Sequence, residues 1–189
     1  MTAFTACVLA LLLAGPSAAA AASFSLEPQQ RTDALRVGAQ SITRDSFDTE
    51  WRVANQSGET LMVITPFYRL VLAARNAAFK NERMKDNEPD KLLREQQDRL
   101  VIWANLYGRR EDFARFYAPR IVLGDREIEP TFVQNERTAL RTEGGGYLAR
   151  CVYGFPVKEL APKGRLVLVV RDPDGKDVSR FTIDLASMR

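Results

Sequence analysis

The sequence predicts a mostly β fold, an antiparallel β-sandwich with a helical segment inserted at about residues 66–97. Three observations lead to this class. Short segments that alternate apolar and polar residues recur along the chain, turn-forming residues separate them, and one stretch between them shows helical spacing instead. About seven or eight short strands are expected, a number typical of a sandwich.

The first pair of strands is expected at about residues 47–65, around a turn at Asn55–Gly58. Apolar residues alternate with polar ones before the turn and again after it, as in strands with one buried face. Gly58 can adopt the positive φ that such a turn commonly needs, and Asn55 and Ser57 can close it with side-chain hydrogen bonds. These features predict a hairpin.

Residues 66–97 are expected to be helical. Thr65 can cap a helix that begins with Pro66, and apolar residues then fall at three- and four-residue spacing as far as Met84. A second helical piece is expected at about Asp90–Gln97, where two leucines stand among charged and amide side chains. This stretch interrupts the strand pattern.

The remaining strands are expected on the C-terminal side of the helices. The closing hairpin has the clearest pattern, because the apolar run Arg165–Arg171 is followed by Asp172-Pro173-Asp174-Gly175, which suits a type I turn. Alternating apolar residues then return from Phe181 to Leu185. Four further strands are predicted between the helices and this hairpin, at Arg99–Tyr107, Phe116–Leu123, Glu127–Gln134 and Tyr147–Phe155.

Residues 1–22 are expected to be a cleavable signal peptide. The apolar run Val8–Ala14 is too short to span a bilayer as a helix, which takes about 20 residues, but it has the length of a signal-peptide core. A Gly-Pro pair and an alanine run follow, and they favour cleavage after Ala20 or Ala22. No Lys or Arg precedes the apolar run, so a retained N-terminal anchor is the alternative.

Residues 23–189 are expected to form a single domain, without a transmembrane span, that is periplasmic or secreted. Their number suits one hydrophobic core, and no second apolar run is long enough to cross a membrane. The chain has 27 Lys and Arg against 24 Asp and Glu, a formal net charge of +3. So mild an excess does not predict nucleic-acid binding.

The composition limits the chemistry that the chain can perform. It contains no His, which removes the usual general base and the commonest metal ligand. Cys151 is the one cysteine outside the signal peptide, so the mature chain can form no intramolecular disulfide. A buried, inert thiol is expected there, and the alternative is an intermolecular disulfide or a reactive thiol beside Arg150. We assign no catalytic, cofactor-binding or metal-binding residue.

Two segments resemble exported bacterial immunoglobulin-like domains. Val53–Val63 is similar to their turn-linked strand pair, and Leu160–Val169 with the Asp-Pro-Asp-Gly turn is similar to their closing strands. The resemblance implies an immunoglobulin-like sandwich used for recognition or assembly, and it implies no reaction.

The expected function is that of an exported, non-catalytic binding or structural module of the bacterial cell envelope. A periplasmic carrier of a small apolar ligand is the alternative. Such a carrier would hold its ligand between the helix and the sheet, in a cavity lined by Phe67, Leu70, Phe79 and Trp103. A hydrolase is a third possibility, but the acidic residues stand mostly in turns and beside Arg, as on solvated faces.

Arg69, Lys80 and Arg83 are the candidate partner-binding residues. They lie away from the apolar stripe of the first predicted helix, in the part of the chain with the local excess of positive charge. If the stripe packs on the sheet, the three side chains point to water and can meet an acidic protein or an anionic envelope surface. The alternative is a solvated helix face without a partner.

Overall fold

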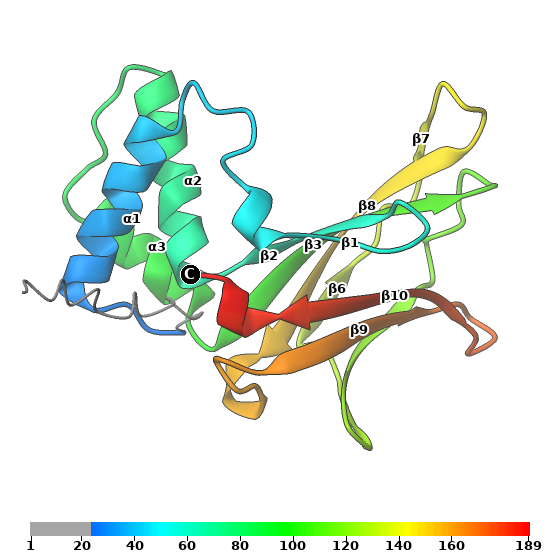
Figure 1. The fold of residues 1–189 in the computed structure, drawn as a ribbon. Coiled ribbons are helices and arrows are strands. Elements are labelled where there is room, and N and C mark those ends of the chain that lie inside the picture. Colours follow the sequence, from blue (N-terminus) through cyan, green and yellow to red (C-terminus); the bar gives the residue numbers. More distant parts are fainter. Residues whose placement is uncertain (1–23) are drawn as a thin grey trace, which may run out of the picture.

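A computed structural model of the chain describes residues 24–189, so the predicted signal peptide lies outside the described residues. Two antiparallel sheets pack face to face, and three helices gather at one end of them (Figure 1). Strand residues outnumber helical ones. The prediction of a mostly β fold with two antiparallel sheets is therefore confirmed.

The first sheet has six strands. Its hydrogen-bonded order is β1-β2-β3-β8-β6, and β7 also pairs with β8. The expected strand from Phe47 is shorter than predicted, because the chain makes a 3₁₀ turn at Thr49–Trp51 before β1 begins. The strands are β1 (Arg52–Ala54), β2 (Thr60–Ile64), β3 (Arg99–Gly108), β6 (Phe132–Gln134), β7 (Leu140–Arg141) and β8 (Tyr147–Pro156).

The second sheet has four strands in the order β10-β9-β4-β5. The predicted closing hairpin is confirmed, and Asp172 closes its turn by accepting hydrogen bonds from the backbone N–H groups of Asp174 and Lys176. The single strand predicted at Glu127–Gln134 is wrong. It divides around Pro130, which lacks a backbone donor, into β5 and β6 of different sheets. The strands are β4 (Ala118–Leu123), β5 (Arg126–Ile128), β9 (Arg165–Arg171) and β10 (Asp177–Asp184).

Two of the three helices were predicted. α2 (Pro66–Phe79) begins at the expected cap, where the Thr65 hydroxyl accepts a hydrogen bond of 3.1 Å from the backbone N–H of Tyr68. It ends before Met84, since Asn81 has a φ of 56° that a helix does not tolerate. α3 (Glu88–Gln96) matches the second predicted piece.

The third helix, α1 (Pro28–Gln40), was not predicted, so helix is not confined to residues 66–97. α1 packs against α2 through its small residues. A Cβ added to Gly38 would lie only 2.4 Å from the Val71 carbonyl oxygen and 2.7 Å from the Ala74 Cβ, so the two helices nearly touch there. Ala34, on the same side of α1, is fully buried.

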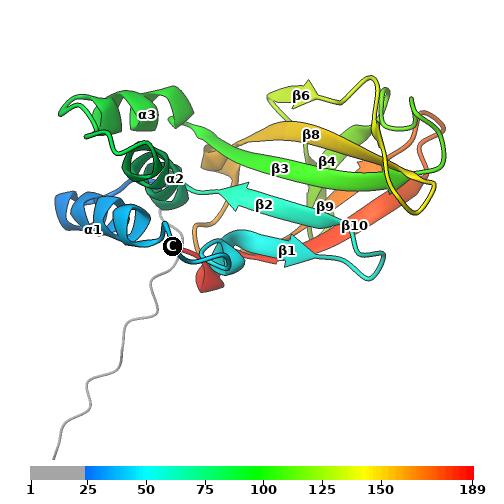
Figure 2. The ribbon, with the colours of Figure 1, turned by 90° about the horizontal axis from the view of Figure 1, so that it is seen from above.

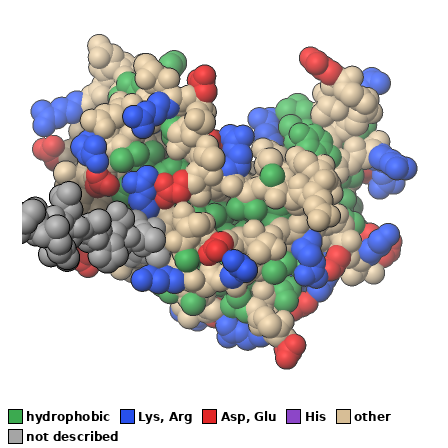
Figure 3. All heavy atoms as spheres, in the orientation of Figure 1, with side chains coloured by type: hydrophobic (Ala, Val, Ile, Leu, Met, Phe, Trp, Pro, Cys, Tyr) green, Lys and Arg blue, Asp and Glu red, His purple; other side chains and the backbone are tan. Residues whose placement is uncertain are grey.

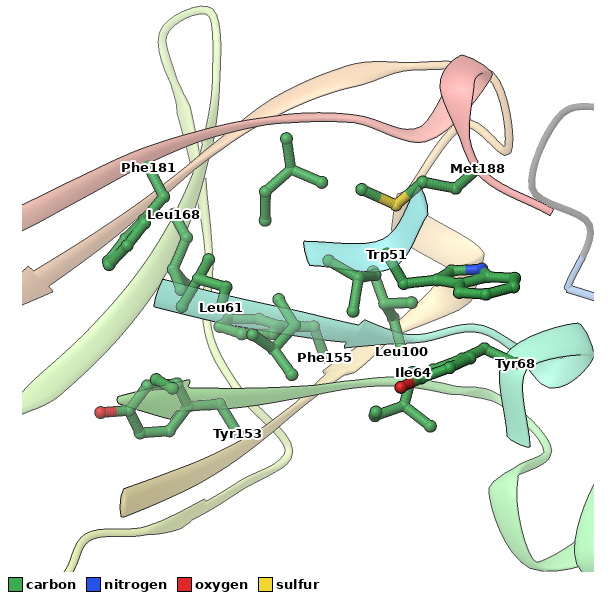
Figure 4. Packing of buried hydrophobic residues seen from close by; sticks show 14 of the residues in the cluster. Trp51, Leu61, Ile64, Tyr68, Leu100, Tyr153, Phe155, Leu168, Phe181 and Met188 are labelled. Atoms are coloured by element: carbon green, nitrogen blue, oxygen red, sulfur yellow. The ribbon is translucent and has the colours of Figure 1, made fainter. Parts of the chain in front are cut away.

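The main core lies between the sheets and continues under the helices (Figure 4). Leu168 and Phe181 of the second sheet face Leu61 and Phe155 of the first. At the helical end, the Trp51 ring stacks on Tyr68, with 4.3 Å between ring centroids. This end of the core joins the helices to both sheets.

Cys151 lies in β8 and faces this core, with only 1% of its surface exposed. Burial raises the pKa of the Cys151 thiol, because the thiolate would lose its hydration. The expected buried thiol is therefore present, and its reactivity as a nucleophile is reduced.

Candidate binding groove on the first sheet

The outer face of the first sheet, which points away from the second sheet, is the floor of a groove. Seen from above, the helices gather at one end of the sheet and leave this face open (Figure 2). In space-filling view, the helices form one wall and the β7–β8 hairpin forms the other, with Lys, Arg and apolar side chains between them (Figure 3). We call this surface the groove.

The strand register determines which side chains lie together along the groove floor. Residues directly opposite each other on paired strands point to the same face. Trp103 on β3 stands at the middle of one such row and is 42% exposed, whereas its neighbours Ile102 and Ala104 point into the core. The row runs across five strands as Arg52, Met62, Trp103, Val152 and Gln134.

Two hollows share Trp103. The first hollow, of about 420 Å³, lies toward β1 and contains Met62, Trp103, Asn105, Arg52 and Arg150. The second hollow, of about 280 Å³, lies toward α2 and α3 and is lined by Ile64, Arg69, Glu95, Gln96, Arg99, Val101, Trp103 and Phe132.

The arginines of the first hollow have acidic partners within the protein. The Arg52 guanidinium lies 2.6 Å from the Asp48 carboxylate, and the Arg150 guanidinium lies 3.8 Å from that of Glu136. Tyr68 lies beside Asp48. Burial, and then the negative charge of Asp48, raise the pKa of the Tyr68 hydroxyl, so that it stays neutral.

The arginines of the second hollow lack such partners. Among residues 24–189, the Arg69 side chain forms no hydrogen bond or ion pair, although it is only half-exposed. The Arg99 guanidinium lies over the Phe132 ring, 5.8 Å from its centroid, and donates a hydrogen bond of 3.3 Å to the Glu95 backbone carbonyl. Neither guanidinium is paired with a carboxylate in the described chain, and the Glu95 carboxylate is instead 3.9 Å from Lys91.

Gly154 holds the Phe132 ring on the groove floor. The two residues are paired across β8 and β6. A Cβ on Gly154 would lie 2.1 Å from the Phe132 ring, so only glycine leaves room for the ring to lie over the sheet. The second hollow depends on this close approach.

The structure separates the three predicted partner-binding residues. Arg69 lies in the first turns of α2 and lines the groove, whereas Lys80 follows the last residue of the helix, about 16 Å further along its axis. Arg83 lines a different hollow, with Leu35, Ala78 and Met84. The three side chains therefore do not form one surface, because the helix runs away from the sheet.

The lining proposed for a carrier cavity is wrong. Phe67 and Leu70 are buried in the core, Phe79 is 75% exposed at the end of α2, and Trp103 faces the groove. These four side chains point to three different environments. They do not line a cavity between the helix and the sheet.

Sequence reasoning missed Arg99 and Phe132 and gave Trp103 a different role. One signal was present, since Arg99, Val101 and Trp103 take the outward positions of an alternating strand, where a Trp is unexpected.

Within the described residues, Cys and the carboxylates form no group of three or more that could hold a metal ion. No described helix combines the length and hydropathy needed to cross a membrane.

No family model matches the sequence. No curated protein matches it either. Among solved structures, the chain is similar to a protein of unknown function from Burkholderia pseudomallei K96243, with a TM-score of 0.44 and 9% sequence identity, over 86% of this chain and 91% of that chain.

Proposed function

We propose that the chain is an exported, non-catalytic binding module of the bacterial cell envelope, and that the groove is its binding face. The observation that carries this proposal is the exposed indole of Trp103 at the centre of a concave surface edged by arginines. Trp and Arg are the residues most enriched among those that dominate binding energy at protein interfaces. Side chains of this kind favour recognition of a ligand rather than its chemical conversion.

The strand order supports an immunoglobulin-like sandwich. Constant-type immunoglobulin domains have strands A, B, E and D in one sheet and strands C, F and G in the other. In chain order, β2, β3, β4, β6, β8, β9 and β10 would be strands A to G. The sheet orders β2-β3-β8-β6 and β10-β9-β4 then become A-B-E-D and G-F-C, which match the two immunoglobulin sheets. α2 and α3 would then be an insertion between strands A and B, and β1 an addition at the sheet edge. Because such folds serve many functions, the proposed activity depends on the groove and not on the fold.

Export is the second part of the proposal, and it depends on the signal-peptide pattern of residues 1–22. Mass spectrometry of the protein from the soluble envelope fraction is expected to find a chain that begins at Ala21 or Ser23. A chain that still begins with Met1 in that fraction would contradict cleavage. The same fractionation tests whether the protein is periplasmic or secreted.

The binding face is tested by capturing partners from an envelope extract at low salt. Trp103→Asp places a charge on the groove floor and is expected to remove the proteins that the wild type retains. Phe79→Asp is the matched control, because Phe79 is also an exposed aromatic but lies at the end of α2. An identical set of captured proteins for wild type and Trp103→Asp would exclude the groove as the binding face.

A further inference from the structure

We infer that the second hollow of the groove binds an acidic, apolar segment of a partner protein in extended conformation. Arg69 and Arg99 would hold a carboxylate of that segment, while Trp103 and Phe132 would pack against its apolar side chains. This inference rests on the proposed binding function of the groove and names the chemistry of its ligand.

The charge of the second hollow favours a carboxylate. Two guanidinium groups line a space of about 280 Å³ without a paired carboxylate from the described chain, whereas Arg52 and Arg150 of the first hollow both have one. Two cations near each other repel, and a bound anion relieves that repulsion. The planar guanidinium also matches a carboxylate with two parallel hydrogen bonds. The Glu95 carboxylate also lines this hollow, but it lies 3.9 Å from Lys91, so both guanidinium groups still lack a paired carboxylate and a ligand carboxylate can supply it.

The floor of the hollow favours apolar side chains next to that carboxylate. Val101, Trp103 and Phe132 contribute apolar surface to it. The backbone groups of β3 between them are directed along the sheet to β2 and β8, so they cannot bind a ligand above the face. A glycan needs many hydrogen-bond partners for its hydroxyl groups, and Val101, Trp103 and Phe132 offer a single donor among them, the Trp103 indole N–H. An acidic polypeptide with apolar side chains fits it better.

The shape of the groove favours an extended chain over a membrane. β3, the strand that carries Trp103, runs between the helices and the β7–β8 hairpin, which both rise above the sheet (Figures 1 and 3). A flat bilayer surface would touch these walls before it reached the indole. A single extended polypeptide can enter between them.

The test is a titration of the purified protein with a synthetic peptide that alternates glutamate with leucine, and with a matched peptide that has lysine in place of glutamate. Trp103 fluorescence is the readout, since Trp51 is buried. The glutamate peptide is expected to bind at least tenfold more tightly than the lysine peptide. Arg69→Gln combined with Arg99→Gln is expected to weaken its binding at least tenfold. Lys80→Gln combined with Arg83→Gln is the control with the same change of charge, and it should leave the affinity unchanged.

Phosphatidylglycerol vesicles and polygalacturonate are titrated in parallel as other anionic ligands. Three results would overturn the inference: equal affinity for both peptides, unchanged affinity in the Arg69→Gln, Arg99→Gln variant, or binding to the vesicles or polygalacturonate without binding to the glutamate peptide. Circular dichroism of each variant checks that it is folded. If Trp103→Asp loses the envelope partners while the peptide results fail, the groove remains the binding face and only its ligand is wrong. If Trp103→Asp keeps those partners, the proposed function itself fails.

Discussion

The indole Nε1 of Trp51 donates a hydrogen bond of 2.9 Å to the backbone carbonyl of Arg189, which lies 138 positions later in the chain. The same carbonyl accepts a hydrogen bond from the Thr65 hydroxyl, and the Arg189 guanidinium lies 2.8 Å from the Glu50 carboxylate. These contacts join the segment after β10 to the start of the first sheet and to the cap of α2. Trp51 thus connects the second sheet to the helical end of the molecule.

Trp51→Phe is expected to lower the free energy of unfolding by about 2 kcal/mol, because it keeps an aromatic ring in the core but removes part of the buried side chain and leaves the part-buried Arg189 carbonyl with one donor fewer. Urea unfolding followed by circular dichroism measures the change. Trp103→Phe is the control on an exposed indole and should change stability by less than about 0.5 kcal/mol. Equal effects of the two substitutions would show that the Arg189 contact contributes nothing.

Gly38→Ala is expected to lower the free energy of unfolding by about 1–3 kcal/mol, although alanine is the better helix former. The reason is the added Cβ, which would lie 2.4 Å from the Val71 carbonyl oxygen and would force α1 and α2 apart. Gln29→Ala, at an exposed position of α1, is the matched control with no expected loss. Increased stability of Gly38→Ala in urea would contradict the close approach of the two helices.

Patterns within one element were readable from the sequence. Buried and outward-facing residues alternate along β3, and Thr65 with Pro66 marks the start of α2, so both elements were predicted where they occur. α1 was missed because its buried side consists of small residues such as Ala34 and Gly38, which give no apolar stripe. The close packing that stabilises it depends on α2 and cannot be seen in α1 alone.

The candidate site could be predicted only in part, because it too depends on contacts between elements. Arg69 was identified from its place on one helix. The role of Arg99, Trp103 and Phe132 depends on the register of β3, β8 and β6, which brings Phe132 into one hollow with Arg99 and Trp103, about 30 positions earlier in the chain. Strand register is a tertiary property, so the sequence pattern predicted the strands but not the groove.

Arg171 makes the stability of the second sheet depend on pH. Its guanidinium donates hydrogen bonds of 2.9 Å to Glu127 and 3.0 Å to Asp177, and these bonds hold the pKa of both carboxyls below their ordinary values. The folded state therefore takes up protons less readily than the unfolded state. The resulting stabilisation is present above the ordinary pKa of about 4 and is lost as the pH falls through the lowered values.

Arg171→Gln is accordingly expected to destabilise the protein at pH 7 and to have a progressively smaller effect as the pH is lowered to about 2 and the two carboxyls take up protons. Urea unfolding at a series of pH values measures this difference. Added salt should reduce the effect at pH 7, because the cluster is exposed to solvent. Arg44→Gln is the control, since Arg44 forms no ion pair in the described chain. A loss of stability that is equal at both pH values would exclude the ionic origin of the effect.

Gly154→Ala is expected to displace the Phe132 ring from the groove floor and to destabilise the protein, and this loss of stability should depend on the presence of the ring. The new Cβ would lie 2.1 Å from the Phe132 ring, so the ring must leave the groove floor, at an expected cost of about 1–3 kcal/mol in the free energy of unfolding. When Phe132 is already alanine, the clash is absent, and Gly154→Ala should then cost less than about 0.5 kcal/mol. Urea unfolding of the two single variants and the double variant measures this coupling.

In the double variant the clash is relieved, but the affinity for the glutamate peptide should not be restored. The glutamate peptide is expected to bind weakly to Gly154→Ala and equally weakly to the double variant, since both lack the Phe132 ring beside Arg99. This combination separates a role of Phe132 in the ligand site from a role in folding alone. If the two substitutions have additive effects on stability, the ring does not depend on Gly154 for its place. If the double variant binds the peptide as tightly as the wild type, Phe132 is not part of the site.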